Sequence, residues 1–283
     1  MMRIRELLGG MICALADNGV ENARFEAEQI LCAAGIARIR LITEPNEPVP
    51  EDVSKAADEM LKRRLGGYPL QYLLGEWEFF GLPFEVGEGV LIPRQDTETL
   101  AELGRDFLLE READERRAAD LCAGSGCIGI TLAKLCGADV KCVELSESAF
   151  GYLERNITLN GAGERVLAVR GDVSDAALAE SMGEFDIIVS NPPYLDDKDM
   201  ENLQTEVGYE PKMALYGGKN GLDFYRRILA IWTKRLKRGG MFAVEIGIGQ
   251  ERGVAEIFAE NGIAAEFAKD TQGIYRVVYG VKN

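Results

Sequence analysis

The stretch Asp120-Leu121-Cys122-Ala123-Gly124-Ser125-Gly126-Cys127-Ile128-Gly129 decides the fold of this chain. An apolar run at residues 118–122 leads into it and is typical of a buried strand, and the apolar residues 128–136 that follow it are typical of a helix. Glycines between a strand and a helix let the backbone turn sharply and approach a ligand, while the first N–H groups of the helix face that ligand. The stretch therefore predicts a cofactor-binding loop, and a purely structural turn is the alternative.

The pattern around this loop repeats. Runs with the length of buried strands lie at residues 140–144, 166–169, 185–190 and 241–246, and they alternate with helical patterns at residues 97–110, 147–160, 222–236 and 250–261. Strands that alternate with helices indicate a mostly parallel sheet covered on both faces. The last two runs, 264–268 and 275–281, leave no room for a crossover helix, so we expect that pair to be antiparallel.

The residues before this alternating pattern show mainly helical spacing of apolar side chains. Apolar residues recur at helical spacing in 4–15 and 23–34, and a third helix is expected over 51–65. Aromatic and β-branched residues about a glycine-containing turn then predict a β-hairpin. We expect a helical N-terminal domain over 1–75, a β-hairpin linker over 76–90 and a catalytic α/β domain over 91–283.

Composition narrows the function classes. The chain has 47 acidic and 32 basic residues, a formal net charge of −15, and this balance argues against DNA or RNA as the direct substrate. No histidine is present, so imidazole-based nucleophiles and the usual Cys/His zinc sites are excluded, and no metal site is expected. The six cysteines are scattered and are interpreted as reduced core thiols. No apolar run approaches the roughly 20 residues of a membrane span, and no signal peptide is recognised, so a cytoplasmic protein is expected.

Glu144 ends the strand that follows the glycine loop. A carboxylate about 20 residues after such a loop is placed to accept both ribose hydroxyls of an adenosine, in NAD or in S-adenosylmethionine. A solvated strand end without a ligand is the alternative.

Asn191-Pro192-Pro193-Tyr194 distinguishes between these cofactors. It follows the run 185–190 directly, and its two prolines fix the chain so that the Asn191 side chain and nearby carbonyls are held rigidly. These acceptors suit the hydrogens of an –NH₂ group, and the Tyr194 ring suits a flat amide or base. Methyl transfer from S-adenosylmethionine to a weakly nucleophilic, conjugated nitrogen needs this set, whereas a dehydrogenase does not.

With these residues in place, the sequence resembles the release-factor glutamine methyltransferases, the PrmC/HemK family of class I S-adenosylmethionine-dependent methyltransferases. The resemblance covers nearly the whole chain, whereas Asn-Pro-Pro-Tyr alone is shared with adenine and guanine amino-methyltransferases. The matching segments are Arg64-x-x-Gly67-x-Pro69-x-x-Tyr72-x-x-Gly75, Leu91-Ile92-Pro93-Arg94-x-x-Thr97-Glu98, residues 185–194, Glu210-Pro211, Ala214-Leu215, Gly217-Gly218, Gly221-Leu222-Asp223, Tyr225-Arg226, Glu245-Ile246-Gly247, Gln250, and Asp270-x-x-Gly273-x-x-Arg276.

The resemblance implies a small helical N-terminal domain, a β-hairpin linker and a seven-stranded Rossmann-like catalytic domain. It implies methylation of the glutamine in the Gly-Gly-Gln motif of peptide chain release factors, giving N5-methylglutamine, with the helical domain binding the release factor. By motif position, the implied cofactor-binding residues are Cys122, Ala123, Gly124, Ser125, Gly126, Glu144, Val173 and Asn191. The implied glutamine-binding residues are Asn191, Pro192, Pro193 and Tyr194, of which Asn191, Pro192 and Tyr194 are the expected catalytic residues.

The sequence departs from the family pattern in the cofactor loop. Cys122 and Ala123 stand where glycine and threonine are usual, Glu144 replaces aspartate, and Val173 replaces a common tryptophan. Gln95-Asp96 replaces Pro-Glu. A cysteine can be tolerated at 122 if the backbone avoids the region of positive φ, which favours glycine, so a negative φ is expected there.

The expected chemistry needs no strong base. Asn191 Oδ1 and the Pro192 carbonyl would accept the two hydrogens of the amide nitrogen as it attacks, and the product proton can leave to water. Two alternatives stay open, an N6-adenine methyltransferase of RNA or DNA and a cofactor-binding scaffold without catalysis. A monomer is expected.

Overall fold

The computed structural model describes residues 2–283 and divides into two compact units. The first unit comprises the residues up to Glu76 together with Gln204–Tyr209, and the second comprises Trp77–Leu203 and Glu210–Asn283. Met1, the first residue of the predicted N-terminal domain, lies outside the described residues.

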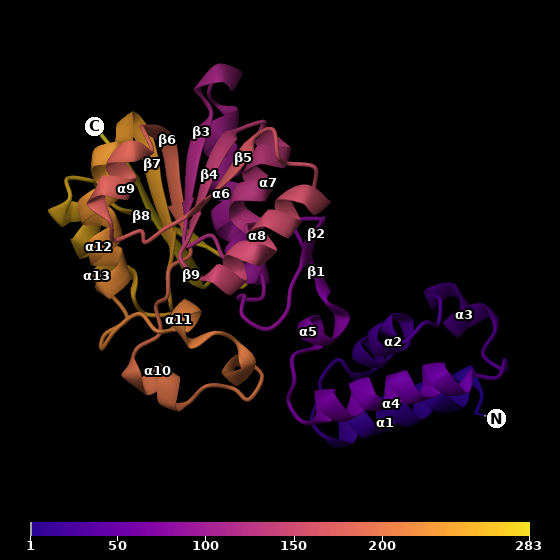
Figure 1. The fold of residues 1–283 in the computed structure, drawn as a ribbon. Coiled ribbons are helices and arrows are strands. Elements are labelled where there is room, and N and C mark those ends of the chain that lie inside the picture. The colour runs from indigo at the N-terminus through magenta and orange to yellow at the C-terminus, as the bar shows by residue number, and fades with distance from the viewer. Residues whose placement is uncertain (1) are drawn as a thin grey trace. The chain divides into compact units, whose positions relative to one another are not determined.

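The first unit is helical (Figure 1). Its helices are α1 (Ile4–Asp17), α2 (Ala23–Ala33), α3 (Arg38–Thr43), α4 (Glu51–Leu65) and α5 (Leu70–Leu74), with the short 3₁₀ turn η3 (Val207–Tyr209). The three predicted helices are confirmed, and α3 and α5 are two short additions. Their shared core consists of residues spaced at helical intervals, so burial of one apolar stripe per helix accounts for the packing.

Arg64 ties three segments of this unit together. The residue is 6% exposed, and its guanidinium pairs with both oxygens of Glu26 on α2, at 2.5 and 3.0 Å, and with Glu206 at 2.8 Å. Gly67 lies so close to Thr205 that a Cβ there would come within 2.5 Å of its methyl group. Arg64 and Gly67 are the first two specified positions of the matching segment 64–75. Both thus hold residues 204–209 against the helices.

A β-hairpin, β1 (Glu76–Phe79) and β2 (Leu82–Glu85), forms where the aromatic stretch predicts one. Both loop residues, Phe80 and Gly81, have positive φ, which is the backbone of a type I′ turn. The Phe80 N–H donates to Glu98 at 2.8 Å. Phe79 and Phe84 are buried in the core of the second unit.

The second unit contains a seven-stranded sheet. Its strands are β3 (Arg117–Leu121), β4 (Asp139–Glu144), β5 (Val166–Arg170), β6 (Phe185–Ser190), β7 (Leu236–Glu245), β8 (Glu266–Lys269) and β9 (Tyr275–Val281), in the order β5-β4-β3-β6-β7-β9-β8. The first five strands are parallel, and β9 is antiparallel to both β7 and β8. The predicted parallel sheet with an antiparallel end is confirmed.

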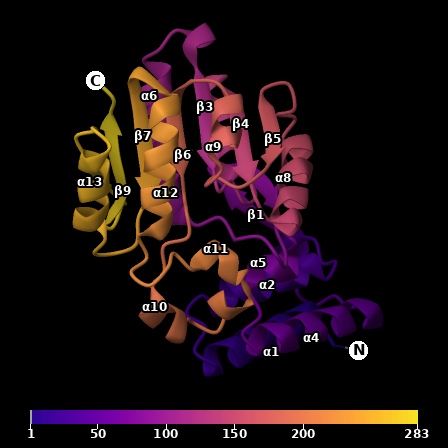
Figure 2. The same ribbon diagram turned by 60° about the vertical axis from the view of Figure 1, so that its left-hand side comes forward.

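Helices cover both faces of this sheet (Figures 1 and 2). One face carries α6 (Glu98–Leu109), α7 (Cys127–Cys136) and α8 (Glu147–Leu159), and the other carries α9 (Ala176–Ser181), α12 (Asp223–Trp232) and α13 (Glu251–Glu260). Successive residues of β6 divide between the two cores: Ile187 and Val189 belong to the first, Ile188 to the second. A strand buried on both faces explains the continuous apolar run at 185–190.

Short elements complete the second unit. They are η1 (Gln95–Thr97), η2 (Ala113–Glu115) and η4 (Thr233–Arg235), and two small helices after β6, α10 (Asp197–Glu201) and α11 (Lys212–Leu215). Within residues 2–283, no helix has the length and apolar character needed to cross a bilayer.

Candidate active site

The site lies where the strand order changes direction. From β3 the chain moves to β4 and β5 on one side, and later to β6 and β7 on the other. In an open parallel sheet this leaves a crevice at the carboxyl ends of the two central strands. Leu121 and Ser190 lie opposite each other at these ends, and Ser190 Oγ donates to the Leu121 carbonyl at 2.7 Å. The glycine loop and Asn191 therefore begin side by side.

Cys122 opens the loop in the left-handed region, with φ of 60°. The expectation that its backbone avoids positive φ is wrong. The loop must leave β3 in a turn that also takes Gly124 and Gly126 to positive φ, and the Ala123 N–H is anchored on the Val143 carbonyl at 3.0 Å. The turn therefore determines the backbone conformation at residue 122. For a residue with a Cβ, this left-handed conformation costs about 1–2 kcal/mol.

Glu144 reaches back onto the glycine loop. One carboxylate oxygen accepts the Gly124 N–H at 2.8 Å, and the other accepts the Ser146 N–H at 2.7 Å. Each oxygen has two lone pairs, so each can accept one further hydrogen bond. The side chain stays 9% exposed and lines the cavity described below. The longer reach of glutamate compared with aspartate is thus used to brace the loop.

Asp120 supports the loop from beneath. Its Oδ2 accepts the Gly129 N–H in the first turn of α7 at 2.8 Å, while its Oδ1 is buried without a hydrogen-bond partner among the described residues. Burial, opposed by the Gly129 hydrogen bond and reinforced by the nearby Glu144 charge, raises the pKa of Asp120 to about 7. Asp120 thus holds the start of α7 against the end of β3.

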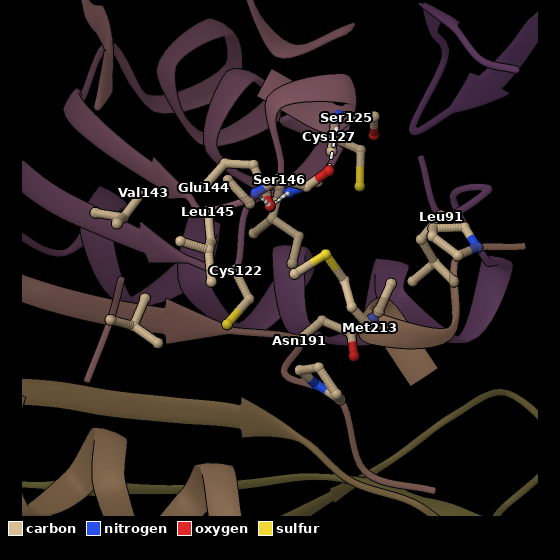
Figure 3. Close-up of a pocket in the computed structure, with 18 of the residues that line it drawn as sticks. Leu91, Cys122, Ser125, Cys127, Val143, Glu144, Leu145, Ser146, Asn191 and Met213 are labelled. Carbon is tan, nitrogen blue, oxygen red and sulfur yellow. Dashed lines mark hydrogen bonds between the residues drawn. The ribbon is translucent and has the colours of Figure 1, made fainter. Parts of the chain in front are cut away.

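A cavity opens above the loop, with an empty space of about 930 Å³ when its solvent-open part is included. Figure 3 shows Cys122, Glu144 and Asn191 on different sides of it, with the Met213 side chain reaching into it. The sequence-predicted residues on its wall are Cys122, Ala123, Gly124, Ser125, Glu144, Val173, Asn191 and Pro193. The wall does not include Gly126, Pro192 or Tyr194. The structure thus brings most of the predicted cofactor-binding residues together with Asn191 and Pro193, whereas the other two residues of the tetrad do not line the cavity.

The Asn191 side chain is directed by a buried hydroxyl. Its Nδ2 donates to Thr97 Oγ1 at 3.3 Å, and Thr97 is 2% exposed. With the amide nitrogen bound to Thr97, the Asn191 Oδ1 atom is the end of the amide that can accept hydrogen bonds from a ligand. Sequence reasoning assigned no role to Thr97, although it belongs to the matching segment 91–98.

Tyr194 points into the protein. Its hydroxyl lies 3.5 Å from Glu245 Oε1, and burial together with the Glu245 charge raises the pKa of the phenol. Its carbonyl accepts from Gln250 Nε2 at 2.9 Å. Gly247 approaches its ring so closely that a Cβ would lie 3.1 Å from Tyr194 Cδ2. Tyr194 is therefore a partly buried side chain that anchors the loop.

Two glycines from the matching segments pack on the same loop. A Cβ on Gly217 would come within 2.6 Å of Tyr194 Cα and 2.7 Å of the Pro193 carbonyl oxygen. A Cβ on Gly221 would come within 2.2 Å of the Tyr194 carbonyl oxygen. Glycine is thus required at both places by close backbone approach, and the scattered family segments converge on residues 191–194.

Sequence reasoning assigned no role to three further residues on or beside the cavity wall, Arg94, Glu210 and Met213. Arg94 is the one cationic side chain on the described cavity wall, and its guanidinium pairs with the buried carboxylate of Glu210. Glu210 also accepts the Ile92 N–H at 3.0 Å. Met213 of α11 is 53% exposed although it lines the cavity. Arg94 and Glu210 stood in the quoted segments, but Met213 had no sequence signal.

The cavity thiols are not activated. Burial raises the pKa of Cys127 to about 12 and raises that of Cys122 as well, so both stay protonated near neutral pH. All six cysteines are free thiols. Within residues 2–283, no three Cys, Asp or Glu side chains are grouped closely enough to hold a metal ion.

Comparison with known proteins shows which families this chain matches. A model of the PrmC N-terminal domain matches residues 6–75, and a model of the methyltransferase small domain matches residues 100–210. A release factor glutamine methyltransferase of Geobacter sulfurreducens is 42% identical over 98% of this chain and 96% of its own length. Proteins of the same name from Clostridium acetobutylicum and Moorella thermoacetica are 37% and 38% identical, covering 87% and 90% of this chain and 86% and 89% of their own lengths.

Solved structures share the fold at low identity. The catalytic domain of hMettl16, in complex with MAT2A 3′UTR hairpin 1, is 15% identical and superposes with a TM-score of 0.59 over 82% of this chain and 80% of its own. Human methyltransferase 10 domain containing protein is 18% identical, with a TM-score of 0.53 over 72% and 91%. At these identities the likeness concerns the fold alone.

Proposed function

The chain belongs to the release factor glutamine methyltransferase family, and on that premise we propose that it methylates the glutamine of the Gly-Gly-Gln motif in peptide chain release factors. The methyl donor is S-adenosylmethionine, and the products are N5-methylglutamine and S-adenosylhomocysteine. The observation that carries the proposal is the position of Asn191. It lies on the wall of the cavity that Glu144 and the glycine loop share, with its amide nitrogen bound to Thr97.

The residues of the cavity fit S-adenosylmethionine. The loop leads to the N-terminus of α7, where Cys127 and Ile128 line the cavity, and a helix N-terminus suits the carboxylate at the methionine end of the cofactor. Glu144 keeps one free acceptor site on each oxygen, which matches two ribose hydroxyls. Val143 and Val173 give an apolar wall for the adenine. When bound, the cofactor supplies an electrophilic methyl group on a positively charged sulfur.

Asn191 positions the acceptor nitrogen. An amide nitrogen is a weak nucleophile because its lone pair is delocalised into the carbonyl. In this proposal its two hydrogens are accepted by Asn191 Oδ1 and by the carbonyl of Pro192, which is not itself on the wall but lies between the wall residues Asn191 and Pro193. These hydrogen bonds favour a tetrahedral nitrogen whose lone pair can attack. These acceptors also stabilise the positive charge that develops on the nitrogen. The proton that becomes acidic leaves to water, so the absence of histidine is no obstacle.

The division of labour between the two units follows the family premise. The second unit contains every residue of the cavity wall. The first unit, which the PrmC N-terminal model matches over residues 6–75, binds the release factor and confers selectivity. On this account residues 1–75 form the recognition domain, 76–90 the linker and 91–283 the catalytic domain, acting in the cytoplasm as a monomer.

An adenine N6-methyltransferase of RNA or DNA is the rival activity, because it uses the same tetrad. Nucleic-acid substrates require Lys and Arg to neutralise phosphates. The net charge is −15, and the described cavity wall carries Arg94 alone as a cation, already paired with Glu210. Incubation with labelled S-adenosylmethionine and either release factor or nucleic acid separates the two. Label should enter the release factor, and label in nucleic acid alone would overturn the proposal.

Replacement of Asn191 tests the role of the tetrad. Asn191→Ala should bind S-adenosylmethionine within a few-fold of wild type, yet lose about 10²–10³-fold in turnover, as when a transition-state hydrogen-bonding group is removed. Calorimetry and methyl-transfer rates give the two quantities. Asn202→Ala, at an exposed helix end, is the matched control and should keep full turnover. Near-normal turnover in Asn191→Ala would remove the assignment, and cofactor binding without any methyl transfer by the wild type would favour a scaffold.

A further inference from the structure

Three segments of the cavity wall lie outside the glycine loop, and hydrogen bonds join them pairwise. They are residues 91–97, 191–195 and 210–217. Asn191 Nδ2 donates to Thr97 Oγ1 at 3.3 Å, which joins the first segment to the second. The Leu195 N–H donates to the Leu215 carbonyl, and the Gly217 N–H donates to the Leu195 carbonyl, both at 2.8 Å. These two bonds join the second segment to the third.

Glu210 joins the third segment to the first. Its side chain is 1% exposed. One carboxylate oxygen accepts the Ile92 N–H at 3.0 Å, and the other pairs with the guanidinium of Arg94. Because a carboxylate accepts through both oxygens, this one buried side chain holds the two segments together. The three segments therefore form a closed ring around part of the cavity, which we call the acceptor ring.

The acceptor ring presents mainly apolar surface to the cavity. Most of its wall residues are aliphatic or proline side chains, such as Leu91, Pro193 and Met213. Its polar wall residues have partners within the ring, since Arg94 pairs with Glu210 and Thr97 accepts from Asn191. A ligand thus meets hydrocarbon surface together with the acceptor oxygen of the Asn191 amide.

Met213 is the wall residue of the ring that a ligand would cover most. It is the second residue of α11, and its side chain is exposed although it reaches into the cavity (Figure 3). Hydrogen bonds of the ring hold the backbone on both sides of it, through Glu210 and through Leu215. A methionine side chain is unbranched, with three rotatable bonds and a polarisable sulfur, so it adapts to the shape of a ligand. The ring thus combines a fixed backbone with an adaptable apolar side chain.

We propose that Met213 is a substrate-contacting residue, which packs on the side chain of the acceptor glutamine and excludes water from the methyl group in transit. The inference deepens the proposed function and rests on it. A glutamine side chain carries its amide on two CH₂ groups. The amide is received by Asn191, and the CH₂ groups need an apolar neighbour, which Met213 supplies.

Exclusion of water favours this reaction because of the way its charge moves. The carbon–sulfur bond breaks while the carbon–nitrogen bond forms, and one positive charge spreads over both atoms before it settles on nitrogen. The nitrogen afterwards loses one of its two hydrogens to water as a proton. Water stabilises a charge localised on sulfur better than the same charge spread over two atoms. A dry acceptor ring therefore lowers the barrier to transfer.

Oxidation of Met213 reports the contact without turnover. Peroxide converts exposed methionines to sulfoxides, so Met213 should react much faster than Met241, which is 2% exposed and is the internal control. With S-adenosylhomocysteine bound, a saturating amount of release factor should slow oxidation of Met213 about 10-fold, because oxidation follows exposure. Release factor with alanine in place of the Gly-Gly-Gln glutamine should protect Met213 far less. Mass spectrometry of the peptides gives the rates, and equal rates with and without release factor, or equal protection by both release factors, would overturn the inference.

Substitutions of Met213 test the effect on the reaction. Met213→Gln keeps the length of the side chain but makes its end polar. It should lower kcat/KM for release factor about 10–100-fold, the range that burial of one methionine side chain is worth. Met213→Leu stays apolar and should remain within about threefold of wild type. Lys212→Gln is the matched control and should keep full kcat/KM, because Lys212 is exposed on the same helix and is not on the described wall.

Cofactor binding separates the contact from damage to the cavity. Both Met213 variants should bind S-adenosylmethionine as wild type does, measured by calorimetry. Wild-type kcat/KM in Met213→Gln, or equal losses in Met213→Gln and Met213→Leu, would overturn the inference. The oxidation measurement uses the wild-type protein, so it decides even if a variant does not fold. Wild type that methylates no release factor would instead contradict the proposed function.

Discussion

At the scale of single residues, the site contains residues whose backbone conformation or burial lowers the stability of the folded protein. Cys122 has a left-handed backbone, and Asp120 and Glu245 are carboxylates buried with one oxygen unpartnered among the described residues. Each costs folding free energy. Cys122 lies in the cofactor loop, Asp120 lies on the strand that leads into it, and Glu245 lies beside the acceptor tetrad. Perturbed groups of this kind cluster at functional sites.

Cys122 tests the strain directly. Cys122→Gly removes the Cβ that the left-handed backbone disfavours, against the greater chain entropy that glycine loses on folding. The balance should raise the free energy of unfolding by up to about 1 kcal/mol. Urea unfolding measures it. The control is Ala123→Gly at the next residue, which lacks positive φ and should lose roughly 0.5–1 kcal/mol. Equal losses in both variants would show that Cys122 is unstrained.

The raised pKa of Asp120 predicts that the free energy of unfolding depends on pH. The folded-state pKa of about 7 exceeds the ordinary value of 3.8, so between these values the folded protein holds a proton that the unfolded chain has released. The contribution of Asp120 is therefore complete below about pH 4 and is lost as pH rises through about 7. Asp120→Asn cannot ionise, so its stability relative to wild type should improve by roughly 2–3 kcal/mol between pH 5 and pH 8.

Urea unfolding of wild type and Asp120→Asn at these two pH values gives the difference. Asp58→Asn on the exposed face of α4 is the control for an aspartate-to-asparagine change at a solvent-exposed position. A difference between Asp120→Asn and wild type that stays constant with pH would mean that Asp120 is ionised in the folded protein at pH 5.

At the scale of elements, the loop after β6 depends on glycines that approach it closely. Gly217→Ala adds a methyl group 2.6 Å from Tyr194 Cα, where backbone must move. We expect a loss of about 1–3 kcal/mol in stability and at least about 10-fold in kcat, with cofactor binding preserved. Gly163→Ala is the control, because its methyl group meets only Ile157 Cγ2 at 3.9 Å. Unchanged kcat in Gly217→Ala would show that the loop position is not critical.

Most elements of this fold could be predicted from the sequence. The strands ending at Leu121, Glu144 and Ser190 are short apolar runs between helical patterns, and the antiparallel pair at the C-terminus follows from the missing crossover helix. Helices of six or fewer residues, such as α3 and α11, are too short to show a periodic signal. Their positions are set by packing on distant segments, which local sequence does not encode.

The site could be predicted only in part, for a similar reason. Cys122 and Asn191 come directly after strands and Glu144 is the last residue of one, so their place at one sheet edge follows from topology. The direction of a side chain does not. Tyr194 turns to Glu245, 51 residues away in the chain, and Thr97 reaches Asn191 from a distance of 94 residues. Such long-range hydrogen bonds leave no local pattern in the sequence.

At the scale of the whole molecule, the matching segments are distributed over the two units. The matching segments of the family fall into two groups: Arg64 and Gly67 hold residues 204–209 within the first unit, while Thr97, Gly217, Glu245 and Gln250 surround the tetrad in the second. The net charge of −15 suits a protein substrate better than a phosphate backbone. These features together favour glutamine over a nucleobase as the acceptor.

Mass spectrometry of the Gly-Gly-Gln peptide, from a release factor incubated with this protein and S-adenosylmethionine, tests the central claim most directly. Fragmentation should place one added methyl group on the glutamine side chain. The Asn191→Ala protein should leave that peptide unmodified under the same conditions. A peptide that stays unmodified with the wild-type protein, or a methyl group on any other residue, would contradict the account.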